Sequence, residues 1–248
     1  MIVGLYILGA VVALLAVNCL IGFAVRIRSE NLVRSRLADH PFLAITYDDG
    51  PSEFMTPRVL DLLDEWNAVA TFFVVGRQVA ERPEMIERIR SFGHEIGWHS
   101  SRHLNAWRSL PVRAVRDVRD MPVMFRNGEH HPDLFRPPYG KATLLTLLAM
   151  RRQRQSYAPW TVVSGDTHGT LPSISEVVEQ VEQAGGGIVL MHDHDREGQP
   201  HGEREEFVLQ LTSALLSLAR ARKWPVLPVS DLAGLRETGK TGEAEPGA

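Results

Sequence analysis

Residues 42–51 read Phe42-Leu-Ala-Ile-Thr-Tyr-Asp-Asp-Gly-Pro51, an apolar run that ends in two carboxylates and a turn. The run has the length and the residue types of a buried strand. Polar side chains directly after such a strand commonly form the functional site of an α/β fold. Asp48 and Asp49 point in different directions on extended backbone, so one can bind a metal while the other addresses a water molecule. An ordinary Asp-Gly turn is the alternative explanation.

Outward from this stretch, residues 41–234 alternate short apolar runs with helical patterns. Further strands are predicted at 70–75, 94–98, 134–136, 188–191 and 225–228. Helices are predicted at 56–67, 83–93, 111–125, 141–152, 174–184 and 204–222. Thr56 is the expected N-cap of the first helix. About six or seven such units predict an α/β barrel or a strongly curved parallel sheet rather than a sandwich.

Two histidines follow the predicted strand at 94–98. His99 and His103 converge on one point if the segment turns helically, and zinc favours imidazole nitrogen with an occasional carboxylate oxygen. Two histidines and one aspartate would leave an open coordination position for water. A solvated surface pair is the alternative, because a chain with 10 histidines can contain this spacing by chance.

Three more strand ends carry polar residues. In Arg136-Pro-Pro-Tyr-Gly140 the prolines stiffen the backbone and leave the Tyr139 N–H as a fixed donor for an oxyanion, while Arg136 can pair with a carboxylate. A stiff loop with a surface arginine is the alternative. Asp166 and His192 follow two later runs, and an imidazole beside a buried carboxylate can deliver a proton to a leaving group. The polar loop residues interpreted as solvated are His130, His131, His194, Asp195 and His201.

Taken in order, residues 46–51, 99–103 and 136–140, Asp166 and residues 190–192 resemble the five motifs of the polysaccharide deacetylase family. This family is also called the NodB homology domain or carbohydrate esterase family 4. The resemblance covers about residues 41–234. It implies a distorted (β/α) barrel, a divalent metal that is most often zinc, and removal of N- or O-acetyl groups from sugars and sugar polymers.

The resemblance also implies a role for each matching residue. Asp49, His99 and His103 would be the metal ligands. Asp48 would be the general base and His192 the general acid.

Four further roles follow from the same resemblance. Arg136 would orient the base, and the backbone N–H of Tyr139 would bind the oxyanion. Leu190 would form an apolar wall for the acetyl methyl group, and Asp166 would tune the acid. Two positions depart from the family pattern, with Tyr47 in place of a phenylalanine and Thr167 in place of a tryptophan, and the second change is expected to reshape the substrate groove.

These roles predict a metal-dependent hydrolase that removes an N-acetyl group from an amino sugar in a glycan or lipid-linked saccharide, by metal-activated water. A deformylase or another C–N amide hydrolase of the same fold is one alternative. A catalytically inactive, membrane-tethered glycan-binding module is the other.

The first 25 residues predict a transmembrane anchor. Residues 2–25 carry no formal charge, and as a helix they would be about 36 Å long, enough to cross a hydrocarbon core of about 30 Å. A cleaved signal peptide is the alternative, but its basic n-region is missing and the apolar run is too long. A basic juxtamembrane linker is expected at 26–40 and a disordered tail at 235–248.

The arginines that follow the apolar run indicate on which side of the membrane the domain lies. Arg26, Arg28, Arg34 and Arg36 follow the apolar run, and the positive-inside rule favours a cytoplasmic domain. Interaction of these arginines with lipid headgroups, while the domain is translocated, is the alternative. A cytoplasmic domain would act on an N-acylated lipid-linked sugar or glycolipid, and an external one on cell-wall glycan or exopolysaccharide.

Overall composition limits the class of protein. With 27 basic and 30 acidic residues the net charge is −3, and 44% of the residues are hydrophobic. That apolar content excludes a fully disordered chain, and the charge argues against nucleic acid as a partner. The single cysteine, Cys19, cannot form an intramolecular disulfide.

Overall fold

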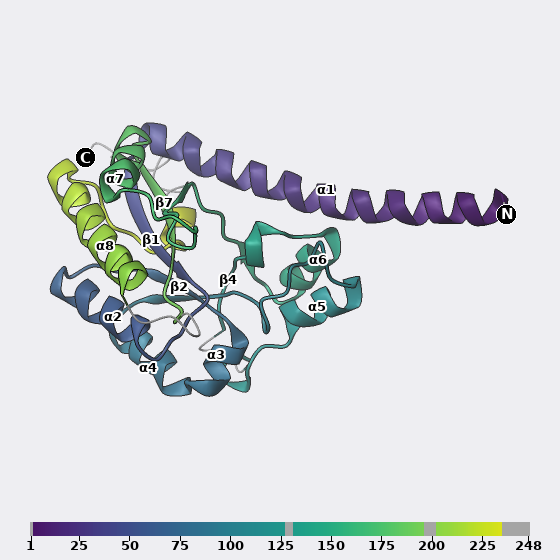
Figure 1. Cartoon of the computed structure of the whole chain (residues 1–248), viewed down its shortest axis with the longest axis horizontal. Coiled ribbons are helices and arrows are strands. Elements are labelled where there is room, and N and C mark those ends of the chain that lie inside the picture. The colour runs from purple at the N-terminus through teal and green to yellow at the C-terminus, as the bar shows by residue number, and fades with distance from the viewer. Residues whose placement is uncertain (1, 127–130, 196–201, 235–248) are drawn as a thin grey trace, which may run out of the picture.

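The computed structural model describes residues 2–126, 131–195 and 202–234. Its centre is a parallel sheet of seven strands in the order β5-β4-β3-β2-β1-β7-β6. The strands are β1 (Phe42–Asp48), β2 (Thr71–Val74), β3 (Glu95–Trp98), β4 (Leu134–Phe135), β5 (Ser156–Tyr157), β6 (Val162–Val163) and β7 (Gly186–His192). The sheet is curled, with helices around it (Figure 1). The predicted distorted (β/α) barrel is confirmed.

The six predicted helices are present with differences at their ends, and two further short helices, at 76–81 and 231–234, were not predicted. They are α2 (Met55–Glu65), α3 (Gly76–Glu81), α4 (Pro83–Ser91), α5 (Pro111–Arg119), α6 (Leu144–Arg152), α7 (Ile174–Gln183), α8 (Glu203–Arg222) and α9 (Asp231–Gly234), with short 3-10 turns η1 (Val123–Phe125) and η2 (Pro138–Gly140). The helix expected at 111–125 is shorter, because Pro122 cannot continue it.

Two local predictions are wrong. Thr56 is not an N-cap but lies inside α2, and the side chain of Ser52 accepts hydrogen bonds from the Met55 and Thr56 amides instead. The strand expected at 225–228 is reduced to a single bridge between Leu43 and Val226. Both ends of that stretch are prolines, which have no N–H to donate to a ladder.

Strand β1 shows how the core positions the site. All seven of its residues are buried, and their side chains alternate between two hydrophobic clusters. Leu43, Ile45 and Tyr47 belong to the cluster that includes residues of α2 and α8, whereas Phe42 and Ala44 belong to the second one. Because successive side chains alternate along a strand, Thr46 and Asp48 share the face of Phe42 and Ala44. Asp48 therefore points toward the concave interior of the sheet.

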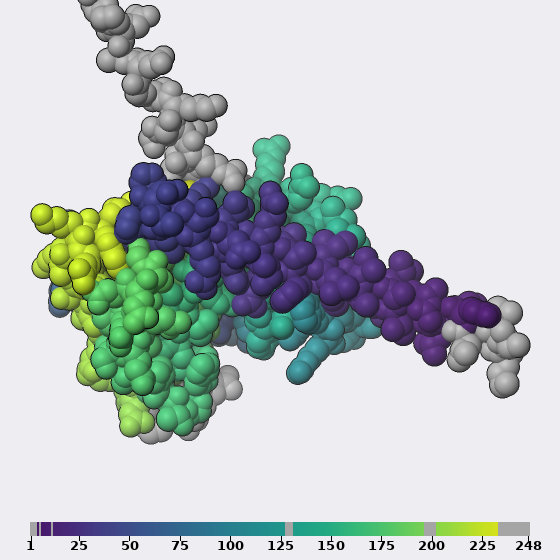
Figure 2. All heavy atoms as spheres, turned by 90° about the horizontal axis from the view of Figure 1, so that it is seen from above, coloured from purple at the N-terminus to yellow at the C-terminus, as the bar shows by residue number. Residues whose placement is uncertain are grey.

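The N-terminal helix α1 runs without a break from Ile2 to Asp39. The linker was expected at 26–40, but residues 26–39 continue this helix and pack on the domain, with Val33 and Leu37 buried in the second cluster. Among the described residues α1 alone is long and apolar enough to cross a membrane, by length and composition. Figure 2 shows its N-terminal half extending beyond the domain. The tail predicted to be disordered, 235–248, lies outside the described residues.

Candidate active site

The register of the sheet brings the predicted residues to one edge. Asp48 pairs with His192 across β1 and β7, and Trp98 pairs with Phe135 across β3 and β4. His99 and Arg136 directly follow the latter two residues. The carboxyl ends of four strands therefore meet at one edge of the sheet, as expected for an α/β barrel.

Asp49, His99 and His103 form a compact cluster. One ligand atom from each lies within 4.8 Å of the others, and Asp49 Oδ1 is 3.0 Å from His103 Nε2 and 3.4 Å from His99 Nε2. The histidines do not converge through a helical turn. They converge through left-handed backbone at Ser100 (φ 72°) and His103 (φ 58°), and Asp49 is also left-handed (φ 75°). Such strain in non-glycine residues is typical of functional sites.

The donor set of this cluster fits a divalent metal. His99 Nδ1 lies 2.7 Å from the Arg136 carbonyl oxygen, to which it donates in the neutral tautomer that leaves Nε2 free to bind a metal. Asp49 Oδ1 is buried, and no described residue makes a well-aligned hydrogen bond to it. Burial raises the pKa of Asp49, but the neighbouring imidazoles of His103 and His99 hold it well below its usual range. Two imidazole nitrogens and one carboxylate oxygen are a typical zinc ligand set.

Asp48 is held by a buried arginine. Arg136 Nη1 donates to Asp48 Oδ1 and to Thr46 Oγ1, both at 2.7 Å, and Nη2 donates to the Pro159 carbonyl oxygen at 3.0 Å. The guanidinium stacks on the ring of Phe73 at 3.9 Å. Asp48 Oδ2 points the other way and lies 3.6 Å from His99 Nε2. The arrangement fixes one carboxylate oxygen and leaves the second beside the metal-ligand cluster.

His192 is oriented by Asp166. The Asp166 carboxylate lies 2.9 Å from His192 Nδ1 and also accepts from the His192 amide at 2.9 Å. Burial lowers the pKa of His192, but Asp166 raises it above its usual value. Asp166 itself is buried and accepts from Ser164 Oγ at 2.8 Å and from Arg204 Nη2 at 3.4 Å. The pair can hold a proton on His192.

Tyr139 and Leu190 occupy the edge of the site. Tyr139 has left-handed backbone (φ 57°), and its ring lies 4.7 Å from that of His103. The hydrogen bonds of the η2 turn use the Gly140 and Lys141 amides as donors, so they do not engage the Tyr139 N–H. Leu190 is buried in the second cluster, opposite Thr46 in the β1–β7 ladder. Their roles toward substrate stay predictions.

The two departures from the family pattern lie in different surroundings. Tyr47 points away from the site, and its hydroxyl lies 2.7 Å from Thr212 Oγ1 of α8, so this change adds a hydrogen bond behind the sheet. Thr167 is exposed in the loop after β6. The expected reshaping of the groove would therefore come from a small side chain at the surface.

Sequence reasoning missed several residues around the site. Arg204 is buried in the first turn of α8 and also donates to the His194 carbonyl oxygen at 2.8 Å. Asp193 is buried beside Gly50 and accepts from Thr56 Oγ1 at 2.5 Å, and burial raises its pKa to about 7. Asp193 belongs to the predicted strand end 190–193 but was given no role, because its partner Thr56 is distant in sequence. No local pattern marks Arg204, whose partner Asp166 is also distant.

Two loop residues interpreted as solvated have structural contacts instead. Asp195 accepts from the amides of Glu53, Phe54 and Met55 at the start of α2. His194 Nδ1 lies 3.8 Å from Asp49 Oδ2, and burial lowers the pKa of His194 to about 4, so it is neutral at pH 7. His130 and His201 lie outside the described residues.

The fold and this strand-end cluster define a class of protein, and comparison with known proteins agrees with it. The family model for polysaccharide deacetylases matches residues 37–157. The chain is 34% identical to a peptidoglycan-N-acetylglucosamine deacetylase of Bacillus cereus, over 61% of this chain and 72% of that protein. It is 35% identical to a chitooligosaccharide deacetylase of Bradyrhizobium sp., over 64% of this chain and 72% of the relative. The chain belongs to the polysaccharide deacetylase family.

Solved structures share the fold. The peptidoglycan deacetylase PdaC from Bacillus subtilis superimposes with a TM-score of 0.65 at 24% identity, covering 81% of this chain and 94% of that one. BA3943 from Bacillus anthracis, described as a family 4 pseudoenzyme, gives a TM-score of 0.65 at 20% identity, covering 78% of this chain and 65% of its own. The fold alone therefore does not decide whether a family member is an active enzyme. That question depends on the residues of the site.

Proposed function

We propose that this chain is a metal-dependent carbohydrate N-deacetylase. The observation that carries the proposal is the placement of Asp48, with Oδ1 fixed by Arg136 at 2.7 Å and Oδ2 beside the Asp49–His99–His103 cluster. An ionised carboxylate held in that position can accept a proton from a water at the cluster.

Asp49, His99 and His103 would hold the divalent ion, most readily zinc. A bound ion supplies Lewis acidity, which lowers the pKa of water and polarises a carbonyl oxygen. Asp48 would accept the proton of the attacking water, and Arg136 holds that carboxylate in its orientation through the 2.7 Å contact with Oδ1.

Bond cleavage needs an oxyanion donor and an acid. The Tyr139 N–H would donate to the oxygen of the tetrahedral adduct, with Leu190 as the apolar contact for the acetyl methyl group. His192 would protonate the departing sugar amine, and Asp166 keeps the His192 ring in the orientation that exposes Nε2 to substrate. The products would be the free amine and acetate.

The substrate that we propose is an N-acetylglucosamine-containing glycan or glycolipid. Two relatives are named for peptidoglycan N-acetylglucosamine and for chitooligosaccharide, and we extend that substrate class to this chain. Release of acetate from acetylated amino sugars, dependent on added zinc, tests the proposal. Release of formate from N-formylated amino sugars, without release of acetate from the acetylated ones, would favour the deformylase alternative.

An inactive glycan-binding module is the second candidate, since a solved family member is described as a pseudoenzyme. Every residue proposed as ligand, base or acid is present in this chain, however: the three proposed ligands have atoms within 4.8 Å of one another, Asp48 contacts Arg136, and His192 contacts Asp166. A zinc-loaded protein that binds the glycan without releasing acyl groups would support the inactive module.

We also propose that α1 anchors the chain in a membrane as a single span. The cytoplasmic orientation remains the prediction of the positive-inside rule. Three of the four arginines on which this prediction rests have contacts within the chain. Arg34 and Arg36 donate to the carbonyl oxygens of Thr161 and Leu232 in the domain, and Arg26 pairs with Glu30. A C-terminal reporter that is active only in the cytoplasm distinguishes the two sides, and an inactive fusion made at normal levels contradicts the cytoplasmic orientation.

A further inference from the structure

Helix α1 reaches the folded domain before its apolar stretch is long enough to cross a bilayer. Among the described side chains of α1, Asn18 is the first that is partly buried, and its side-chain oxygen accepts from the Leu145 amide at 3.2 Å. One turn later Gly22 lies so close to Ala142 that a Cβ would overlap the Ala142 carbonyl. Residues 2–17, which precede these contacts, number 16 and extend about 24 Å as a helix.

A typical hydrocarbon core is about 30 Å thick, and tilting a helix makes it cover less of that thickness. If α1 spans the membrane, as proposed above, the missing length must come from the segment that is already packed on the domain. The part of the domain around Leu145 must then sit at the membrane boundary.

The surface at that place is apolar. Four exposed side chains of this edge are Leu110 (65% exposed), Val112 (70%), Leu145 (42%) and Leu148 (38%). They lie on α5, α6 and the loop before α5, and Figure 1 shows both helices at the end of the domain that faces the free half of α1. A single exposed leucine is ordinary, but a group on one edge indicates an interaction surface.

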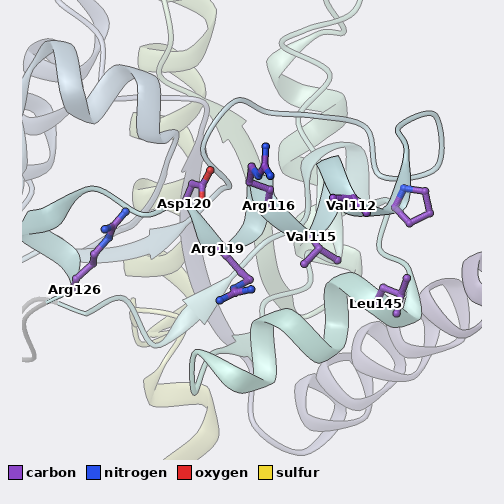
Figure 3. Close-up of a pocket in the computed structure, with 8 residues that line it drawn as sticks. Val112, Val115, Arg116, Arg119, Asp120, Arg126 and Leu145 are labelled. Carbon is purple, nitrogen blue, oxygen red and sulfur yellow. The ribbon is translucent and has the colours of Figure 1, made fainter.

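The same edge is basic. Arg116, Arg119 and Arg126 line a pocket together with Val112 and Leu145 (Figure 3). Asp120 is the one acidic residue among the lining residues, so the lining carries three positive charges against one negative. Within the described part of the chain, Arg116 and Arg119 form no ion pair. Clustered arginines beside apolar side chains are typical of surfaces that bind anionic lipid.

We propose that this α5–α6 edge, residues 107–126 and 141–148, is a membrane-docking surface. Its occupant is an anionic bilayer surface: the apolar side chains enter the headgroup layer, and the arginines bind lipid phosphates. Trp107 fits this placement, because its ring is 38% exposed while Nε1 donates to the Ala142 carbonyl oxygen at 2.7 Å. The surface would fix the orientation of the barrel relative to the membrane as well as its distance from it.

The test uses the full chain in lipid nanodiscs with a nitroxide label at one introduced cysteine. In a Cys19→Ser background the label is placed by Val112→Cys or Leu145→Cys on the edge, by Leu14→Cys in α1, or by Ser217→Cys on α8. Ser217 is the matched control, because it is exposed and belongs to α8, which lies at the other end of the domain from α5 and α6 (Figure 1). Collision with lipid-soluble oxygen is compared with collision with a water-soluble nickel chelate.

On anionic nanodiscs we expect a several-fold higher oxygen-to-nickel ratio at positions 112 and 145 than at 217. If the ratios at positions 112 and 145 equal the ratio at 217 while the ratio at position 14 is that of a label in lipid, the docking proposal is wrong and the membrane anchor is supported. A water-like ratio at position 14 contradicts the anchor itself, and the docking inference fails with it.

A separate comparison tests whether Arg116 and Arg119 bind lipid phosphate. Replacing anionic by zwitterionic lipid, or introducing Arg116→Gln with Arg119→Gln on anionic lipid, should lower the ratio at position 112 several-fold without changing it at position 14. An unchanged ratio at position 112 in both arms overturns the assignment of lipid phosphate to these arginines.

Discussion

Replacing Asp48 by asparagine separates the proposed base from the metal ligands. The amide side chain would keep an oxygen that can accept from Arg136 but would lose the ability to take up a proton. A positioned general base contributes about 10²- to 10⁴-fold to the rate, and we expect kcat to fall by that factor. Asp49, His99 and His103 are untouched, so the zinc content should stay the same.

The same substitution has a stability cost that follows from the contacts of Arg136. The guanidinium is fully buried and keeps its bonds to Thr46 and Pro159, but its counter-ion is gone. Breaking a buried ion pair by removing one partner costs about 3–5 kcal/mol. Asp61→Asn is the matched control, because Asp61 forms an exposed pair with Arg88 at 2.7 Å that is worth at most about 1 kcal/mol.

The assay combines acetate release, zinc content and urea unfolding on the three proteins. Wild-type turnover in Asp48→Asn, with zinc retained, would refute the assignment of the base. Loss of zinc together with activity would show that Asp48 is a ligand rather than a base.

Three further results are expected. Because Asp166 raises the pKa of His192, the proposed acid, Asp166→Asn should lose kcat at a lower pH on the basic side than the wild type does; superimposable pH profiles would contradict the pairing. Chelation should abolish acetate release and zinc should restore it, whereas activity that survives verified metal removal would exclude a metal hydrolase. Leu37→Ala should lower the free energy of unfolding of the domain by about 2–5 kcal/mol, because Leu37 is buried in the second cluster. Leu14→Ala, at an exposed position, should leave it unchanged. Equal effects of the two substitutions would show that the end of α1 is not part of the core.

The sequence predicts the site better than it predicts the way in which the site is assembled. The residue types after each strand predicted a common site, and the structure places Asp48, Asp49, His99, Arg136 and His192 at one edge of the sheet, because parallel strands bring their carboxyl ends together. The convergence of the two histidines was expected from a helical turn and comes from left-handed backbone instead. Residue spacing alone cannot distinguish these two geometries.

Contacts between distant segments account for what was missed. Arg204 reads as one more charge on an amphipathic helix, and only the docking of α8 buries it beside Asp166. Residues 26–40 were interpreted as a basic linker because four arginines follow the apolar run, although Val33 and Leu37 are spaced to face one side of a helix. The partners of such side chains lie far away along the chain, where periodicity carries no information.

X-ray absorption at the zinc edge is the most direct test of the proposed metal centre. The zinc-loaded wild type should show two imidazole nitrogens at about 2.0–2.1 Å, and His99→Ala or His103→Ala should show one fewer. A spectrum that is unchanged by both substitutions would place the zinc elsewhere and contradict the account.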